Sequence, residues 1–202
     1  CRAMRTEHKG AVSNLNYSHK VLAYLAANIE LNDALEDLIQ KLDDNGKLND
    51  TVIALVGDHY PYFLTTDEVN EVSSYTKDSV VEINHSNFIL WNNQMNKIEI
   101  NKVGSQIDVL PTIYNSFGIK YDSRLIIGKD ILSTEPGLAM FGNRSWVSDY
   151  GTYYASTGEF VAKDGVDVPD DYVNKMNKIV SNKINMSGLI LKNNYYQKVL
   201  GE

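Results

Sequence analysis

The sequence has little of several features that usually narrow the function of a protein. It contains a single cysteine, Cys1, which excludes a disulfide bond within the chain and does not by itself place the chain inside or outside a cell. It has no cluster of Lys and Arg, and its net charge is −7, so we expect no nucleic acid among its partners. No apolar run is long enough to span a membrane, and no signal peptide is recognisable.

The composition is otherwise that of a globular protein. The chain has 202 residues, of which 43% are hydrophobic. This length is enough for one domain with a sizeable core, or for one domain and a small appendage. Because the chain starts at Cys1 and not at a methionine, we expect a fragment whose targeting segment lies upstream.

The most informative stretch is residues 51–62. Its first six residues, TVIALV, are aliphatic or β-branched without polar alternation, which predicts a strand buried on both faces, the kind found inside a parallel sheet. Asp58 and His59 follow side by side where the chain leaves this strand. Ligands of open α/β sheets bind beyond the carboxyl ends of the strands, and a carboxylate beside an imidazole suits a divalent cation. Asp58 and His59 are therefore candidate metal ligands; the alternative is a turn with a surface histidine.

Hydrophobic periodicity predicts the elements around this stretch. Residues 1–16 are polar and unpatterned, so we expect a loop there. From Ser18, a candidate N-cap, apolar residues recur at spacings of three and four, which predicts one long amphipathic helix ending at Asn45-Gly46. Residues 63–82 are expected to form a functional loop, with a short helix opening near Thr66, before a second buried strand over residues 87–92.

A capping-box pattern begins the next predicted helix. Ser105 and Asp108 have the spacing of a capping box, and Gly118 is expected to end the helix. Pro111 lacks a backbone N–H, so the helix is expected to begin near Asp108, after an approach turn.

The last third of the chain changes in character. Short aromatic-rich runs are separated by turn residues, which predicts strands joined into antiparallel hairpins. The runs are residues 138–141, 145–148, 152–155 and 159–162. Two helices are expected after them, one opening at Pro169-Asp170-Asp171 and one near the C-terminus.

Several motifs in this order resemble a known family. They are found at residues 24–31, 57–62 (GDHYPY), 104–112 (GSQIDVLPT), 122–130 and 143–146 (NRSW). Together they are similar to the extracellular domain of lipoteichoic acid synthase-like proteins, which belong to the sulfatase branch of the alkaline phosphatase superfamily. The resemblance covers nearly all of the chain.

The resemblance implies an α/β fold in two parts. Residues 1–135 would form the C-terminal portion of a catalytic domain, with part of a doubly wound mixed sheet flanked by helices, as in alkaline phosphatase. Residues 136–202 would form a small subdomain of antiparallel β-hairpins and helix. It also implies a membrane anchor upstream and a catalytic domain outside a bacterial cell membrane.

The resemblance further implies a chemistry. Members of the family use one Mn²⁺- or Mg²⁺-like ion and a threonine nucleophile to take glycerol phosphate from phosphatidylglycerol and pass it to a growing polymer. Asp58 and His59 match the paired metal ligands. The remaining ligands, a glutamate and the threonine itself, and a histidine of a Ser-Gly-His segment belong to motifs upstream of Cys1. We therefore expect one site for Mn²⁺, or for Mg²⁺ or Zn²⁺, that is incomplete in this chain, no catalytic nucleophile here, and no activity of this part alone.

Other residues and functions stay open at this point. His85, before the second strand, is a candidate for binding the substrate, with a surface histidine as the alternative. Tyr60 is a candidate for lining the cleft, or it packs beneath the Asp58 loop. For His8 we expect a solvated loop or helix-cap position; the alternative is that His8, with Arg2 and Arg5, contacts an anionic headgroup.

Three functions remain for the chain. The first is a metal-dependent phosphoglycerol transferase acting on an anionic lipid. The second is a sulfatase or phosphoesterase that hydrolyses a sulfate or phosphate ester; the identity of the upstream nucleophile would separate these two. The third is a non-enzymatic surface that binds polymer or carbohydrate.

Overall fold

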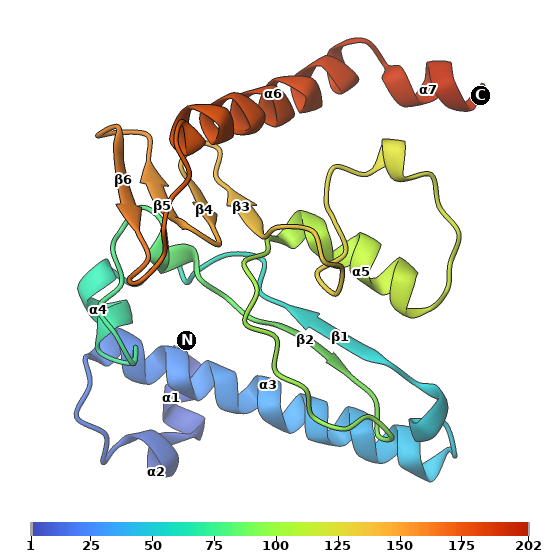
Figure 1. Ribbon diagram of the computed structural model, residues 1–202. Helices are drawn as coiled ribbons and strands as arrows, with labels where there is room; N and C mark the ends of the chain where they lie inside the picture. The colour runs from blue at the N-terminus through green and yellow to red at the C-terminus, as the bar shows by residue number, and fades with distance from the viewer. Residues whose placement is uncertain (1, 202) are drawn as a thin grey trace. The chain divides into compact units, whose positions relative to one another are not determined.

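The computed structural model describes residues 2–201, apart from the side chains of Arg2, Met4 and Arg5, and it divides into two compact units (Figure 1). One unit ends at Ile98 and the other begins at Glu99. The division expected at residues 135 and 136 concerns domains of the family and stays a prediction.

The first unit begins with helices where a loop was expected. Helices α1 (Arg2–Glu7) and α2 (Lys9–Val12) are short, so the prediction of a loop over residues 1–16 was wrong. The reason is tertiary: Val12 is only 2% exposed and packs against Leu22 and Ala26 of the following helix. Val12 is the one buried residue among the described side chains of this segment, and a single buried residue leaves no periodicity to detect.

The long helix is confirmed as α3 (His19–Asp44). Ser18 has the extended backbone of an N-cap, although its side chain makes no capping bond, and its N–H donates to the Glu71 carboxylate at 2.6 Å. After the helix, Gly46 has a φ of 65°, a left-handed conformation that favours glycine and ends the helix as predicted. A 3₁₀ turn, η1 (Leu48–Asp50), leads into the first strand.

The sheet of the first unit differs from the expectation. Strands β1 (Ile53–Val56) and β2 (Phe88–Trp91) pair antiparallel, with Val56 opposite Phe88, and the described residues of this sheet form no third strand. The prediction of strands buried on both faces was wrong, since all eight residues are half-buried or exposed. Val56 is 47% exposed and Ile89 50% exposed. A two-stranded ribbon cannot cover both of its own faces, whatever its apolar content.

The core of the first unit lies between α3 and the segment that joins the two strands. Val21 of α3 packs with Leu64, Val69 and Ile83, and Tyr60 contacts this cluster. The joining segment contains α4 (Thr66–Asn70), which confirms the short helix predicted there, and a 3₁₀ turn, η2 (Glu82–Asn84).

The second unit begins with the predicted capping box. Ser105 and Asp108 form it around the 3₁₀ turn η3 (Gln106–Asp108), and α5 (Val109–Ser116) follows, so the start near Asp108 is confirmed. Gly118 has a φ of 63° after the helix. A further 3₁₀ turn, η4 (Ser123–Leu125), lies in the loop beyond it.

The hairpins are also confirmed. Strands β3 (Leu138–Met140), β4 (Trp146–Ser148), β5 (Gly151–Tyr154) and β6 (Glu159–Ala162) form one antiparallel sheet in the order β3-β4-β5-β6. Helices α6 (Tyr172–Lys192) and α7 (Tyr195–Leu200) complete the unit. The sheets described in both units are antiparallel, and the doubly wound mixed sheet stays a prediction.

Candidate metal-binding site

Asp58 and His59 lie directly beyond β1, separated from its last residue by Gly57. A Cβ atom at Gly57 would lie 2.4 Å from the Ser86 hydroxyl oxygen, so a larger residue would require the Ser86 side chain to move. Because β1 and β2 are antiparallel, this contact lies where β1 ends and β2 begins. The candidate ligands Asp58 and His59 therefore occupy the same end of the ribbon as the residues that precede β2.

The side chains of Asp58 and His59 meet. Asp58 Oδ2 lies 3.3 Å from His59 Nε2, and Asp58 Oδ1 accepts the His59 backbone N–H at 2.8 Å. His59 Nδ1 lies 2.7 Å from the Tyr60 carbonyl oxygen. A carbonyl can only accept, so Nδ1 must carry a proton. Nε2 is then the ring nitrogen that lies next to the carboxylate of Asp58.

This arrangement fits a divalent cation. Ligand bonds of about 2.0–2.2 Å at tetrahedral angles put neighbouring O and N ligand atoms about 3.4 Å apart, close to the observed 3.3 Å. Histidines that bind metals usually donate the proton of their other ring nitrogen to an oxygen, as His59 does. The His59 ring also stacks on Tyr62, with centroids 4.1 Å apart and planes at 8°, which holds its orientation.

The pair is open to solvent. The side chains of Asp58 and His59 are 86% and 44% exposed. Within the described residues, no group of three or more His, Cys, Asp or Glu side chains has the geometry to hold a metal ion. Asp58 and His59 therefore remain a pair of candidate ligands in this part of the chain.

The other candidates lie nearby in sequence but differ in environment. Tyr60 is half-buried, packs against the cluster of Val21 and places its ring edge-on to Tyr62 at 4.8 Å. His85 is exposed, and its Nδ1 lies 2.7 Å from the Tyr75 hydroxyl oxygen. Their predicted contacts with a substrate stay predictions.

His8 has a partner within the first unit. Its Nε2 lies 2.5 Å from the Glu30 carboxylate, and its side chain is only 17% exposed. His8 stands at the N-cap position of α2, which confirms the helix-cap position expected for it, but the side chain is not solvated because the short helices fold it against α3. The side chains of Arg2 and Arg5, which were expected to act with His8, lie outside the described part of the chain.

The sequence analysis did not include Tyr75 or Glu82 among the candidate site residues. The Tyr75 hydroxyl donates to Glu82 Oε2 at 2.7 Å, and burial together with this carboxylate raises the pKa of Tyr75 to about 12. The available signal was weak: Tyr75 lies in the loop that was predicted to be functional, and Glu82 precedes His85 by three residues. Neither spacing indicates a site by itself.

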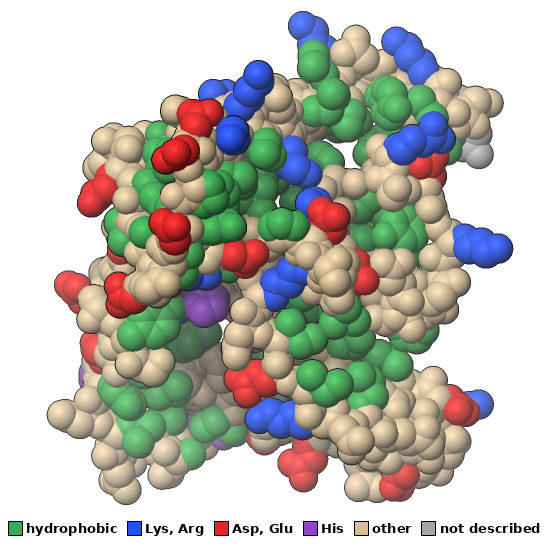
Figure 2. All heavy atoms as spheres, in the orientation of Figure 1, with side chains coloured by type: hydrophobic (Ala, Val, Ile, Leu, Met, Phe, Trp, Pro, Cys, Tyr) green, Lys and Arg blue, Asp and Glu red, His purple; other side chains and the backbone are tan. Residues whose placement is uncertain are grey.

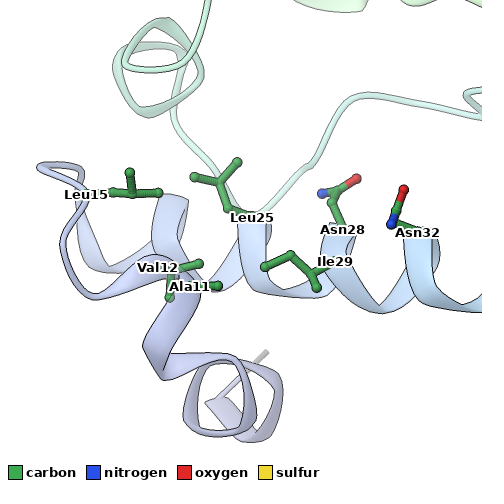
Figure 3. Close-up of a pocket in the computed structure, with 7 residues that line it drawn as sticks. All are labelled: Ala11, Val12, Leu15, Leu25, Asn28, Ile29 and Asn32. Atoms are coloured by element: carbon green, nitrogen blue, oxygen red, sulfur yellow. The ribbon is translucent and has the colours of Figure 1, made fainter.

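A shallow groove lies elsewhere in the first unit, between α3 and the segment of α2 with the turn after it (Figure 3). Its lining is mainly aliphatic with two amides and includes none of the predicted site residues; it consists of Ala11, Val12, Leu15, Leu25, Asn28, Ile29 and Asn32. Without a charged side chain, this groove is poorly suited to a metal ion or an anionic ester.

Acidic and basic side chains are interspersed on the face shown in Figure 2, where apolar side chains also reach the surface. None of the helices in the described part of the chain combines the length and hydropathy needed to cross a bilayer.

Comparison with known proteins supports the sequence resemblance. The chain is 28% identical over 166 residues to the lipoteichoic acid synthase-like protein YvgJ of Bacillus subtilis. This alignment covers 74% of this chain and 26% of that protein. It is 27% identical over 115 residues to the lipoteichoic acid synthase of Staphylococcus saprophyticus. This second alignment covers 55% of this chain and 18% of that protein. The chain thus spans about a quarter or less of the length of these relatives. A model of the sulfatase family matches residues 4–119, more than half of the chain and including Asp58 and His59. The chain therefore belongs to the sulfatase family.

Proposed function

We propose that this chain supplies two metal ligands, Asp58 and His59, to the active site of a metal-dependent phosphoglycerol transferase. The observation that carries the proposal is the 3.3 Å approach of Asp58 Oδ2 to His59 Nε2, with the other nitrogen of the ring held by the Tyr60 carbonyl. Similarity to two lipoteichoic acid synthase-type proteins supports the substrate class, glycerol phosphate carried on phosphatidylglycerol. The nucleophile and the other ligands would come from polypeptide outside these 202 residues.

The chain's own residues orient and expose this site. The Tyr60 carbonyl fixes the tautomer of His59, and the Tyr62 ring keeps the imidazole in place. The exposure of the Asp58 carboxylate leaves room for a phosphate ester to approach. When bound, Mn²⁺ would offset the negative charge of the ester, which is the main requirement of phosphoryl transfer. Magnesium and zinc ions are the alternatives for this O and N ligand set.

The proposal places the working protein at the surface of a bacterial cell. Its substrate is a membrane lipid, so the full-length protein would be held at the membrane by a segment other than those described here, with the catalytic domain outside the cell. Tyr60 would contribute to the wall of the substrate site through the exposed part of its ring.

The test uses the full-length protein. Asp58→Ala and His59→Ala should each lower Mn²⁺-dependent release of glycerol phosphate from phosphatidylglycerol by more than about 100-fold, because loss of one ligand removes most of the affinity for the ion. His19→Ala is the matched control, since His19 is an exposed histidine at the start of α3. Unchanged turnover in either Asp58→Ala or His59→Ala would contradict the metal assignment.

A hydrolase is the second candidate, and the match to the sulfatase family supports it. In that case the same site would transfer the phosphate or sulfate group to water. Assays of the full-length protein with phosphatidylglycerol and with an aryl sulfate distinguish the two. Polymer extension indicates the transferase, whereas free sulfate, or glycerol phosphate released without polymer extension, indicates the hydrolase. Binding of polymer without turnover of either substrate would favour the non-enzymatic alternative.

A further inference from the structure

Two polar side chains, those of Glu82 and His85, meet at the Tyr75 hydroxyl in the first unit. The hydroxyl donates to Glu82 Oε2 at 2.7 Å and lies 2.7 Å from His85 Nδ1. Lys77 supports the arrangement from the other side, because its Nζ lies 5.1 Å from the centre of the Tyr75 ring and donates to the Glu82 carbonyl oxygen at 3.3 Å. The four residues tie the loop before η2 to the residue that follows it.

The hydrogen bonds have a defined direction. An ionised glutamate can only accept, and a tyrosine hydroxyl has a single proton to donate. Since that proton goes to Glu82, the hydroxyl oxygen is left to accept from His85 Nδ1. The order is therefore His85 to Tyr75 to Glu82, and it leaves Nε2 as the ring nitrogen available to a ligand. His85 is exposed, and its ring lies against Tyr75, with centroids 6.4 Å apart.

His85 lies at the end of the ribbon that carries the candidate metal ligands. Val56 of β1 pairs with Phe88 of β2, and the next residue of the first segment, Gly57, approaches Ser86. His85 directly precedes Ser86, and Asp58 directly follows Gly57. Both segments therefore leave the ribbon at the same end.

We propose that His85 Nε2 hydrogen-bonds a non-bridging oxygen of the anionic ester that Asp58 and His59 would bind, and that Tyr75 and Glu82 are positioning residues for this ring. The inference rests on the proposed function for the location of the ester. The ligand class is a phosphate or sulfate ester, whose oxygens accept a hydrogen bond from an imidazolium. The carboxylate of Glu82, acting through Tyr75, stabilises the charged ring when the anion is bound.

The experiment measures calorimetric binding of glycerol phosphate to the full-length protein, with and without Mn²⁺. His85→Ala should weaken binding by about tenfold or more, the loss expected for one hydrogen bond to a charged group. Tyr75→Phe keeps the ring and removes the acceptor for Nδ1, so a loss of about threefold to tenfold is expected. Tyr17→Phe is the control, because Tyr17 is an exposed tyrosine of the same unit and should bind as wild type.

Glu82 provides a readout that a purely structural role would not move. Glu82→Gln keeps an oxygen that accepts from Tyr75 and should retain more affinity than Glu82→Ala, while the thermal midpoints of the two variants stay similar. Methyl sulfate in place of glycerol phosphate shows whether the ester is a sulfate. Wild-type affinity in His85→Ala would overturn the inference, and wild-type affinity in Tyr75→Phe would overturn the positioning role of Tyr75.

Failure of the inference and failure of the proposed function give different results. If only the inference is wrong, Asp58→Ala abolishes Mn²⁺-dependent binding and His85→Ala has no effect. If only the metal assignment is wrong, Asp58→Ala leaves binding and its response to Mn²⁺ unchanged, while His85→Ala still weakens binding of the anion.

Discussion

The two units of this chain use their apolar strands in opposite ways. In the first unit, β1 and β2 consist of eight apolar residues, yet none of them is buried. In the second unit, β4 is shorter and more polar, yet Trp146 and Ser148 are both at most 1% exposed. Trp146 packs against Tyr153, Phe160 and Tyr172, with ring centroids 5.5–6.0 Å apart, and its Nε1 donates to Asn177 at 2.8 Å.

The difference shows that apolar content alone does not produce a buried strand. Alternation gives β4 one face to bury, and its neighbours and α6 supply the covering layer. The ribbon of β1 and β2 has two apolar faces and no such layer within the described residues. The first unit instead buries its apolar residues along α3, and it leaves the end of the ribbon accessible, where Asp58 and His59 lie.

The sharpest test of this comparison uses the two tryptophans of the chain. Trp146→Ala should lower the free energy of unfolding by about 3–5 kcal/mol, because it removes a fully buried aromatic residue. Trp91→Ala, on the half-buried β2, should cost about 1–2 kcal/mol. Urea denaturation followed by circular dichroism measures both. Equal losses would show that the ribbon is as well packed as the second sheet.

A buried carboxylate in the second unit and a half-buried one in the first extend the comparison of the two units. Asp108, 7% exposed, accepts the backbone N–H groups of Ser105 at 2.8 Å and Lys129 at 2.7 Å. Asp108→Ala should destabilise the protein by about 1–3 kcal/mol, because these donors lose their acceptor. In the first unit, Asp78 is the counterpart, and it accepts from Val80 at 2.7 Å and Val81 at 2.8 Å. Asp78→Ala should cost less, about 1 kcal/mol, since water reaches this half-buried turn. A larger loss for Asp78→Ala in urea denaturation would contradict this order.

A smaller effect is expected at the N-terminus of α4. Thr65 Oγ1 accepts the Glu68 N–H at 3.2 Å, and Glu68 Oε2 accepts the Thr65 N–H at 2.8 Å. Thr65→Ala should cost about 1 kcal/mol, the usual loss for a helix cap. Thr65→Ser keeps the hydroxyl and should be close to wild type in thermal unfolding. An equal loss in Thr65→Ser and Thr65→Ala would mean that the methyl group matters more than the capping bond.

The smallest expected effect depends on pH. Because the folded-state pKa of Tyr75 is raised to about 12 from about 10, the folded state favours the protonated hydroxyl. Its contribution to stability is complete below pH 10 and is lost as the pH rises towards 12. The difference in free energy of unfolding between wild type and Tyr75→Phe should therefore shrink between pH 10 and pH 12, as measured by urea denaturation. A difference that is constant over this range would exclude the shift.

Local sequence signals were sufficient for most elements. The helical spacing after Ser18, the turn residues between the hairpins and the capping box at Ser105 each act within a few residues, and α3, the second sheet and α5 follow them. The adjacency of Asp58 and His59 was also visible in the sequence. What failed was the environment of β1, since burial depends on partners that are remote in the chain.

The sequence by itself determined most of the kinds of element and the family, and it predicted Asp58 and His59 as candidate metal ligands, because these depend on spacing and residue type over short stretches. Only the tertiary structure decided the antiparallel pairing of β1 and β2, the folding of residues 2–12 against α3, and the chain of contacts from His85 through Tyr75 to Glu82. The physical reason is that pairing and burial depend on which distant segments meet, and the composition of a single segment does not specify its partner.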